Sequence, residues 1–534
     1  MKLTSFHRVF LSLLFAGSFL HNAHAVVRLP NVFGSHMVMQ RDKPLVVWGW
    51  SAPFEKITVQ LASETQLVHA NENGEWKAVL PALKAGGPYV LQVEGAEGDR
   101  MEYQDVMIGE VWLCSGQSNM ERGIKLSQKS QEEIAAANYP QIRLLKVARQ
   151  LAGNPQTNFQ GNWKVCTPQT VAEGEPGGFT AVGFFYGRDL YQQIHVPIGL
   201  IEDSWSGTRI EGWIPPEKFA STPALAYENS LLQLRDPASP KHKERLQLAI
   251  DETKKWISGA ELALSNNLPV SPLPALSPDL LPPADRQCSA ALFDGMIYPV
   301  CPFPIRGVVW YQGENNHAEG PVYTEKMKAL IAGWRAAWGQ GDFPFYYVQL
   351  APFNYGGKPE SLGAFWEAQA AVQMVTNTGM IVINDLGNLK NIHFSNKQEV
   401  GRRLALLALA KTYGETNLVY SGPTFQDMKI EGDKILIKFD HVGGGLASRD
   451  GKPLDWFEIM DASQGKFVKA DAEIDGSTVV LSNKTVKHPV AMRFAWSMLA
   501  EPNLMNREGL PAGAFRAGTV PVRETNETSS KAQP

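Results

Sequence analysis

Four polar segments of this sequence contain residue types that together could carry out nucleophilic catalysis. A serine nucleophile needs a base that takes its proton, N–H donors that stabilise the oxyanion, and a group that orients the base. Ser118 lies in residues 116–120, Gly-Gln-Ser-Asn-Met, directly after an apolar run, and His393 lies just before a capped helix start. The sequence therefore predicts Ser118 as the nucleophile and His393 as its base.

The predicted oxyanion donors come from three of these segments. Ser118 occupies a sharp strand-to-helix turn, where backbone N–H groups are free to bind an anion. The backbone N–H of Gly207 and the side-chain amide of Asn316 follow two further apolar runs. A lone serine turn, a lone histidine or a lone glycine is more often structural, so the prediction depends on the segments meeting in space.

The predicted alternation of strands and helices indicates how these four segments meet in space. Between residues 106 and 415, short apolar runs bounded by polar turns alternate with amphipathic stretches, which is typical of a parallel sheet in an α/β fold. Ligands bind beyond the carboxyl ends of such strands. The predicted strands are Glu110–Cys114, Pro197–Ile201, Arg306–Tyr311, Phe345–Leu350 and Met380–Asn384, and the predicted helices are Ala181–Gln193, Tyr323–Trp338 and Lys397–Tyr413.

The rest of the chain divides around this core. Residues 1–25 have a basic start, an apolar run and an Ala-His-Ala end, which predict a signal peptide and therefore export to the periplasm or the extracellular space. Residues 26–105 predict a β-sandwich domain, and residues 416–522 a second β-rich domain. An insertion over about 214–293 combines a charged helix, 241–264, with a proline-rich run. Residues 523–534 are polar and predict a disordered tail.

Composition narrows the possible partners. The net charge of −4 and the lack of a long basic cluster argue against nucleic acid as the main partner. No segment is apolar over the roughly 20 residues that a membrane span needs. None of the four cysteines has zinc-ligand spacing, and whether Cys288 and Cys301 form a disulfide stays open, as does the oligomeric state.

The motifs around these residues resemble the sialate O-acetylesterase family, within the SGNH (GDSL-type) hydrolases. The resemblance extends over nearly the whole chain after residue 25, and its motifs are residues 109–120, 196–201, 307–314, 392–405 and 503–511. It implies a flavodoxin-like SGNH hydrolase core flanked by N-terminal and C-terminal β-rich domains. It also implies an esterase that removes O-acetyl groups from sialic acid with Ser118 and His393, that has Ser118, Gly207 and Asn316 in its oxyanion hole, and that needs no metal or organic cofactor.

Two departures from the family pattern affect these expectations. The family often has an aspartate two residues before the catalytic histidine, whereas this chain has Asn391, which can orient an imidazole but cannot stabilise its charge. Glu314 is the first alternative carboxylate and Asp385 the second. Ser206 replaces the first of two glycines and is expected to narrow or polarise the acyl pocket.

The same residues leave two other functions open. The acetylated sugar could be another polysaccharide such as xylan, and the neutral Asn391 is compatible with a non-catalytic glycan-binding homologue. Gln117, Gln312 and Trp205 are the predicted substrate-binding residues.

Overall fold

Seven strands of an 11-stranded mixed sheet form the centre of the protein. The computed structural model describes residues 26–96 and 98–520, so the predicted signal peptide and the whole predicted tail lie outside the described residues. The strand order is β13-β12-β11-β7-β10-β8-β9, and all neighbours are parallel except β8 and β9. The strands are β7 (Arg100–Gly116), β8 (Tyr139–Lys146), β9 (Trp163–Cys166), β10 (Ile198–Ser204), β11 (Gly307–Tyr311), β12 (Phe345–Val348) and β13 (Thr378–Ile381).

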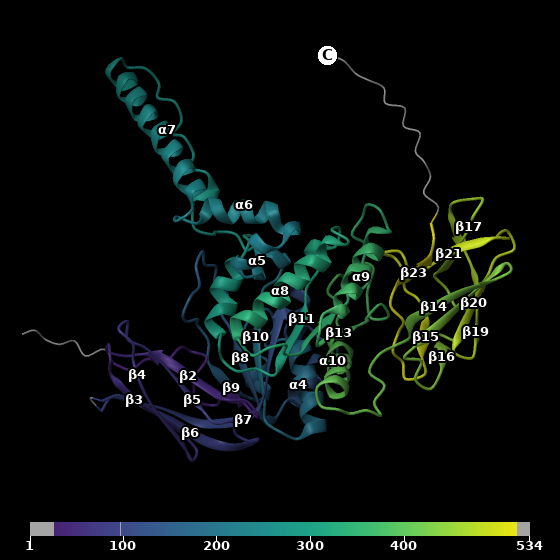
Figure 1. Ribbon diagram of the computed structural model, residues 1–534, viewed down its shortest axis with the longest axis horizontal. Helices are drawn as coiled ribbons and strands as arrows, with labels where there is room; N and C mark the ends of the chain where they lie inside the picture. The colour runs from purple at the N-terminus through teal and green to yellow at the C-terminus, as the bar shows by residue number, and fades with distance from the viewer. Residues whose placement is uncertain (1–25, 97, 521–534) are drawn as a thin grey trace, which may run out of the picture.

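Helices cover both faces of this sheet (Figure 1). On one face, α4 (Ala181–Ile194) packs against α10 (Lys397–Lys411), and Trp112 of β7 meets Tyr186 of α4 edge-on at 5.3 Å. On the other face lie α8 (Val322–Trp338) and α9 (Ser361–Ala371), with Trp334 of α8 edge-on to Trp310 of β11 at 5.6 Å. Three short helices are α1 (Ser118–Glu121), α2 (Ser130–Ala135) and α3 (Pro168–Val171).

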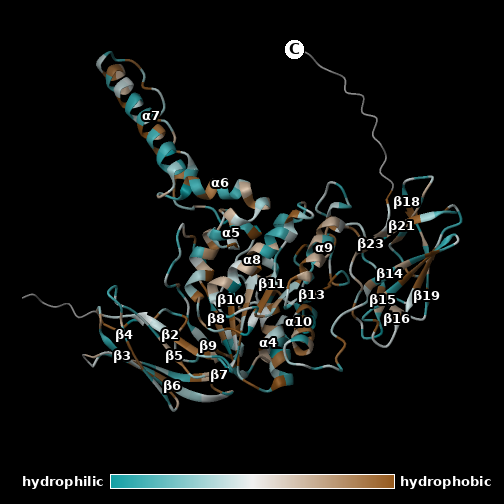
Figure 2. Ribbon diagram, viewed as in Figure 1, coloured by the Kyte–Doolittle hydropathy of each residue, from teal (hydrophilic) through white to brown (hydrophobic). Residues whose placement is uncertain are grey.

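The apolar runs that predict parallel strands coincide with strands of the central sheet. β10, β11 and β7 are buried along their central-sheet portions, and Figure 2 shows these strands as hydrophobic. The sequence did not predict β8, because Arg143 interrupts its apolar run. Arg143 is only 4% exposed, and it donates hydrogen bonds to the carboxylate of Asp105 that compensate for the burial of its charge.

The N-terminal β-rich part is continuous with the central sheet through β7. The first half of β7 pairs antiparallel with β6, and its second half enters the parallel sheet, so the predicted division at 105/106 falls inside one strand. A separate two-stranded antiparallel sheet, β2 with β5, shares a hydrophobic core with these strands. The strands are β1 (Val38–Gln40), β2 (Leu45–Trp50), β3 (Lys56–Leu61), β4 (Glu64–His69), β5 (Glu75–Leu80) and β6 (Gly86–Glu94).

The C-terminal part is a second β-rich unit with its own hydrophobic core. It contains two four-stranded antiparallel sheets, β14-β15-β20-β19 and β18-β17-β21-β23, and the pair β16-β22. The strands are β14 (Thr424–Glu431), β15 (Lys434–Asp440), β16 (Leu446–Ser448), β17 (Phe457–Asp461), β18 (Phe467–Lys469), β19 (Asp471–Asp475), β20 (Thr478–Ser482), β21 (Pro489–Phe494), β22 (Leu504–Asn506) and β23 (Phe515–Gly518).

The segment predicted as an insertion projects from the core as a helical arm (Figure 1). It contains α5 (Pro216–Ser221), α6 (Ala226–Arg235) and the long α7 (Pro240–Ser265), which agrees with the helix predicted over 241–264. After α7 the chain returns along an irregular path to Arg286 and Gln287, which reach the carboxyl end of β10.

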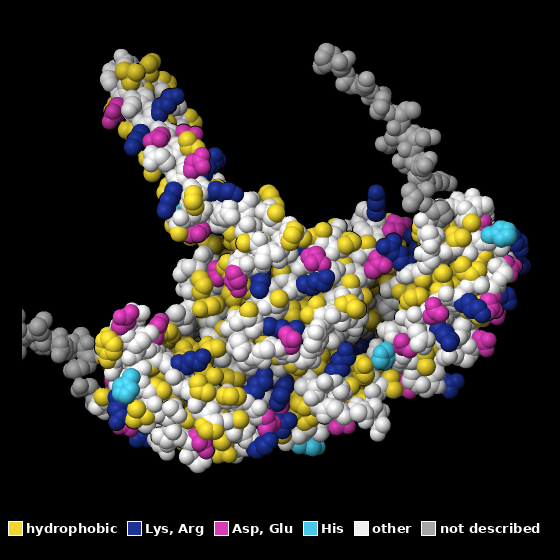
Figure 3. Space-filling model, in the orientation of Figure 1, with side chains coloured by type: hydrophobic (Ala, Val, Ile, Leu, Met, Phe, Trp, Pro, Cys, Tyr) yellow, Lys and Arg dark blue, Asp and Glu magenta, His cyan; other side chains and the backbone are white. Residues whose placement is uncertain are grey.

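Acidic and basic side chains are interspersed over the face drawn in Figure 3, as the small net charge leads one to expect. Across residues 26–96 and 98–520, no helix is both long and apolar enough to cross a membrane. All four cysteines are free thiols, so the structure contains no Cys288–Cys301 disulfide.

Candidate active site

The turn after β7 exposes the backbone N–H of Ser118. Gly116 ends β7 at φ +139, and a Cβ there would lie 2.1 Å from the carbonyl oxygen of Tyr311, so only glycine fits this close crossing. Ser118 is then the first residue of α1 and is 8% exposed. Within the described part of the chain its N–H has no acceptor, and a free N–H at a helix start can bind an oxyanion.

Glu121 connects this turn to the second predicted oxyanion donor. Its carboxylate accepts hydrogen bonds from both the backbone N–H and the hydroxyl of Ser206, and from Arg149 at 2.7 Å. Gly207 follows at φ +71, and its N–H also lacks an acceptor among the described residues. The Glu121 carboxylate therefore holds the loop of Gly207 against the helix of Ser118. The Ser206 side chain thus adds a second hydrogen bond to Glu121.

We expect Glu121→Ala to lower kcat by about a hundredfold, because one misplaced oxyanion donor costs roughly 10²–10³ in kcat. KM should change much less, since Glu121 is buried and binds Ser206 and Arg149. Steady-state kinetics on a chromogenic acetyl ester measure this effect. Glu173→Ala, which removes an exposed carboxylate paired with Lys164, is the matched control. Equal kcat values for the two variants would show that Glu121 does not position the oxyanion hole.

A buried polar network lies on the other side of Ser118. The amide nitrogen of Asn119 donates to Glu314 Oε1 at 2.5 Å and to the carbonyl oxygen of Ile392 at 3.1 Å, and its oxygen accepts from Lys397 Nζ at 2.6 Å. The Lys397 ammonium lies 4.0 Å from the ring centroid of Phe394, in a cation–π contact. Asn119 thus joins the turn of Ser118 to the residue before His393.

His393 lies half-buried among cations. Burial lowers its pKa to about 4, and the positive charges of Arg122 and Lys397 act in the same direction. Its imidazole forms no hydrogen bond or ion pair within residues 26–96 and 98–520, whereas its backbone N–H donates to the side-chain oxygen of Asn391 at 3.0 Å. Asn391 therefore shapes the loop rather than contacting the ring. A neutral imidazole at neutral pH is the form that can accept the proton of a serine.

This arrangement makes a specific prediction about the pH profile. His393 must be neutral to act as the base, so kcat/KM rises with pH as the imidazole loses its proton. The lowered pKa places this acid limb near pH 4, instead of near the ordinary histidine value of about 6.5. Arg122→Gln removes one of the cations, so the acid limb should move to higher pH. The exposed Arg245→Gln is the control, and an unchanged acid limb in Arg122→Gln would contradict the assignment.

Neither alternative carboxylate contacts the imidazole in this structure. Glu314 is 5% exposed, and burial raises its pKa against the opposing effects of the Asn119 hydrogen bond and the Lys397 charge. It is linked to the His393 loop only through Asn119. Asp385 forms a two-point ion pair with Arg403, at 2.7 and 2.6 Å. Glu314 thus lies beside the nucleophile turn, while Asp385 anchors α10.

The structure places Asn316 in a buried network behind the site. Its amide nitrogen donates to Glu211 and Glu319, both at 3.0 Å, and its oxygen accepts from Ile210 N–H at 3.0 Å. Its N–H groups are therefore engaged here, and its role as an oxyanion donor stays a prediction. The side chain of the preceding residue, Asn315, donates to the carbonyl of Gly207 at 2.6 Å and so fixes that loop.

The three predicted substrate-binding residues differ in their surroundings. Gln312 is fully buried and bridges Thr208 and Asn316, while the side-chain oxygen of Gln117 accepts from the N–H of Gly313 at 3.3 Å. Both glutamines thus connect strand ends. Trp205 is half-buried, with Arg149 5.7 Å from its ring centroid, so it has the most accessible side chain of the three.

Four residues of this site received no role from sequence reasoning: Asn119, Glu121, Arg122 and Lys397. Asn119, Glu121 and Arg122 all lie within four residues of Ser118, a proximity that could have marked them. Lys397 was interpreted only as the start of a capped helix, and Asn396 does cap α10 by accepting from the N–H of Glu399 at 3.2 Å. The burial of its ammonium depends on tertiary packing.

Comparison with known proteins points to the same chemistry. Residues 293–410 match a family model described as carbohydrate esterase, sialic acid-specific acetylesterase. A sialate O-acetylesterase from Rattus norvegicus is 30% identical over 88% of this chain and 89% of its own length. The human sialate O-acetylesterase is 28% identical over 88% and 87%. The crystal structure of a carbohydrate acetylesterase from Xanthomonas citri superposes with a TM-score of 0.76, at 35% identity over 92% of this chain and 100% of that one.

Proposed function

Because the chain belongs to the sialate O-acetylesterase family and is an esterase, we propose that it is an exported SGNH-type serine hydrolase that removes O-acetyl groups from sialic acid. The observation that carries the mechanism is the pair of free N–H groups, those of Ser118 and Gly207, on segments that Glu121 holds together. Asn119 links the same turn to the residue before His393. Export is proposed from residues 1–25, which lie outside the described part of the chain.

In the proposed reaction, His393 takes the proton of the Ser118 hydroxyl as its oxygen attacks the acetyl carbonyl. The N–H groups of Ser118 and Gly207 stabilise the resulting oxyanion, and each such donor lowers the barrier by roughly 3–4 kcal/mol. His393 then donates the proton to the departing sugar oxygen, which leaves acetyl-Ser118 and a free sugar hydroxyl. A water molecule, activated by the same imidazole, releases acetate and restores the serine.

Two guanidinium groups beside the site support an acidic sugar as the substrate. Arg122, at the end of α1, has no side-chain hydrogen bond or ion pair to any described residue, although its charge acts on His393 and Lys397. Arg286, from the insertion, is exposed and equally without a partner in the described chain. A Cβ on Gly207 would lie 3.1 Å from its guanidinium. Unpaired arginines are suited to bind a carboxylate in two-point geometry, and sialic acid carries one.

The test compares acetate release from 9-O-acetylated N-acetylneuraminic acid with release from acetylated xylan, at pH 7, where His393 is neutral. Wild-type protein should have the higher kcat/KM on the acidic sugar. Arg122→Gln and Arg286→Gln should each lower the acidic-to-neutral ratio of kcat/KM about tenfold or more. Arg245→Gln on α7 removes an exposed arginine outside the site and should leave the ratio unchanged.

A preference for acetylated xylan, with a ratio insensitive to both arginines, would assign the same chemistry to neutral polysaccharides. Absence of Ser118-dependent acetate release from either substrate would favour the non-catalytic glycan-binding alternative. The name of the Xanthomonas citri relative, a carbohydrate acetylesterase, is compatible with either sugar class.

A further inference from the structure

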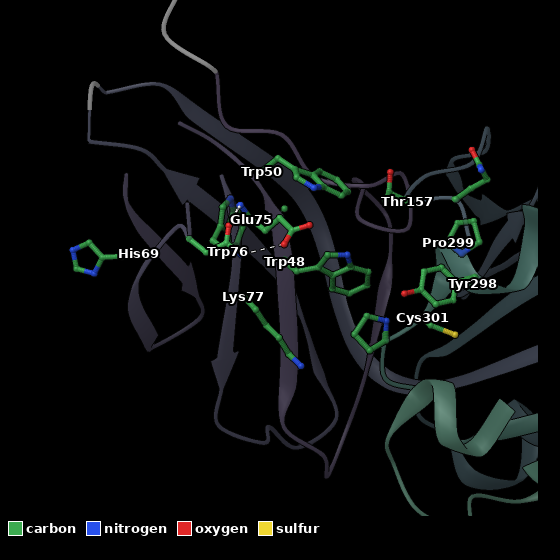
Figure 4. A pocket seen from close by; sticks show the side chains of 14 residues that line it. Trp48, Trp50, His69, Glu75, Trp76, Lys77, Thr157, Tyr298, Pro299 and Cys301 are labelled. Carbon is green, nitrogen blue, oxygen red and sulfur yellow. Dashed lines mark hydrogen bonds between the residues drawn. The ribbon is translucent and has the colours of Figure 1, made fainter. Parts of the chain in front are cut away.

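An aromatic groove lies where the N-terminal β-rich part meets the catalytic unit (Figure 4). We define it by Trp48 and Trp50 on one wall, Tyr298 and Pro299 on the other, and Glu75 and Lys77 beside them. Its volume is about 420 Å³, which is within the usual range of small-molecule sites. It shares no residue with the catalytic set around Ser118 and His393.

Strand geometry explains why two tryptophans face this space. Trp48 and Trp50 are two residues apart on β2, so their side chains lie on the same face, and both are half-exposed. Across the ladder, Lys77 pairs with Trp48 and Glu75 with Trp50, so a charged side chain stands beside each indole. In Figure 4 the two indoles extend toward Tyr298 and Pro299, whereas His69 points away from them.

Other aromatic side chains pack against two of the groove's rings. Phe33 meets the Trp48 ring edge-on, with centroids 4.7 Å apart, and Phe33 in turn meets Phe303 at 5.5 Å. On the opposite wall, Tyr298 is 39% exposed and rests edge-on against Phe293 at 6.0 Å. Rings fixed in this way lose little conformational entropy when a ligand stacks on them.

Polar groups at the groove are left free. Neither the Lys77 ammonium nor the Tyr298 hydroxyl has a partner among residues 26–96 and 98–520, and one oxygen of Glu75 is held by Asn71 at 3.0 Å. A sugar ring presents an apolar C–H face and a rim of hydroxyl groups. Flat aromatic faces next to free donors and acceptors match both features.

We infer that this groove is a second carbohydrate-binding site, which stacks a sugar ring of the glycan between the tryptophan wall and Tyr298. The choice of a sugar as occupant rests on the proposed function. Such a site would hold a glycan chain on the protein while its acetyl groups are removed at Ser118, and it would raise the local substrate concentration without taking part in the chemistry.

Binding of two deacetylated oligosaccharides, 3′-sialyllactose and xylohexaose, tests this inference by calorimetry and tryptophan fluorescence. Full-length wild type and Ser118→Ala should bind at least one of them saturably. Trp50→Ala and Tyr298→Ala should each weaken that binding about tenfold or more. Phe54→Ala, which removes a 70% exposed aromatic of the same domain outside the groove, should not. Thermal unfolding shows whether Trp50→Ala folds, and Tyr298→Ala keeps the test valid if it does not.

Equal affinities in all variants, or no saturable binding of either oligosaccharide in the millimolar range, would overturn the inference. Acetate release by the same samples distinguishes a failure of this inference from a failure of the proposed function. Ser118-dependent hydrolysis without groove-dependent binding would overturn the second site and leave the proposed function standing. Groove-dependent binding without Ser118-dependent hydrolysis would support the second site and contradict the proposed serine hydrolase mechanism.

Discussion

Replacing Ser118 by alanine is expected to lower kcat for acetyl ester hydrolysis by about 10⁴-fold or more, because the protein then has no hydroxyl oxygen to attack the acetyl carbonyl. Stability should change little, since the hydroxyl forms no hydrogen bond to any described residue. The measurement is acetate release under saturating substrate, together with the thermal unfolding midpoint. A matched control is Ser63→Ala, which removes an exposed serine hydroxyl of the N-terminal β-rich part.

A Ser118→Ala variant that keeps more than a few per cent of wild-type kcat would mean that the acetyl group is transferred to water without this serine. Folded Ser118→Ala protein without activity would in turn exclude a contaminating esterase as the source of the wild-type rate.

His393→Ala should have the second largest effect, a loss of about 10³-fold in kcat. General-base catalysis contributes roughly 10²–10⁴, and no second base replaces the imidazole in the proposed reaction. Because the base is lost, the acid limb of the pH profile near pH 4 should disappear together with most of the rate. His488→Ala, an exposed histidine of the C-terminal part, is the control.

Added imidazole offers a further check on His393→Ala, because a small neutral base that enters the vacated space should restore part of the rate. If His393→Ala retained the wild-type kcat and acid limb, the base would have to be another group.

The strands that carry the site could be predicted because buried strands consist of short runs of apolar residues. β7 and β10 are such runs, and the segments that follow them, which contain Ser118 and Gly207, are joined through the carboxylate of Glu121. β8 could not be predicted, since Arg143 makes it look exposed. Its compensating partner, Asp105, belongs to a different segment of the chain.

Side-chain partners within the site could not be predicted either, because they belong to distant segments of the chain. A motif places Asn316 after β11, but the acceptors that engage its amide, Glu211 and Glu319, are brought there by tertiary folding. The sequence offers Asn391 as a partner of the imidazole, whereas the local turn directs its oxygen to the backbone N–H of His393. The pKa of His393 depends on Arg122 and Lys397, whose positions relative to the ring no local pattern contains.

Covalent labelling with diethyl p-nitrophenyl phosphate, which phosphorylates activated serine hydroxyls, tests the central claim most directly. One phosphoryl group should appear on the peptide that contains Ser118, in proportion to the loss of esterase activity. Labelling should be absent in Ser118→Ala and far slower in His393→Ala. Full activity after prolonged treatment, or inactivation with the label on a different residue, would contradict the assignment of Ser118 as the nucleophile.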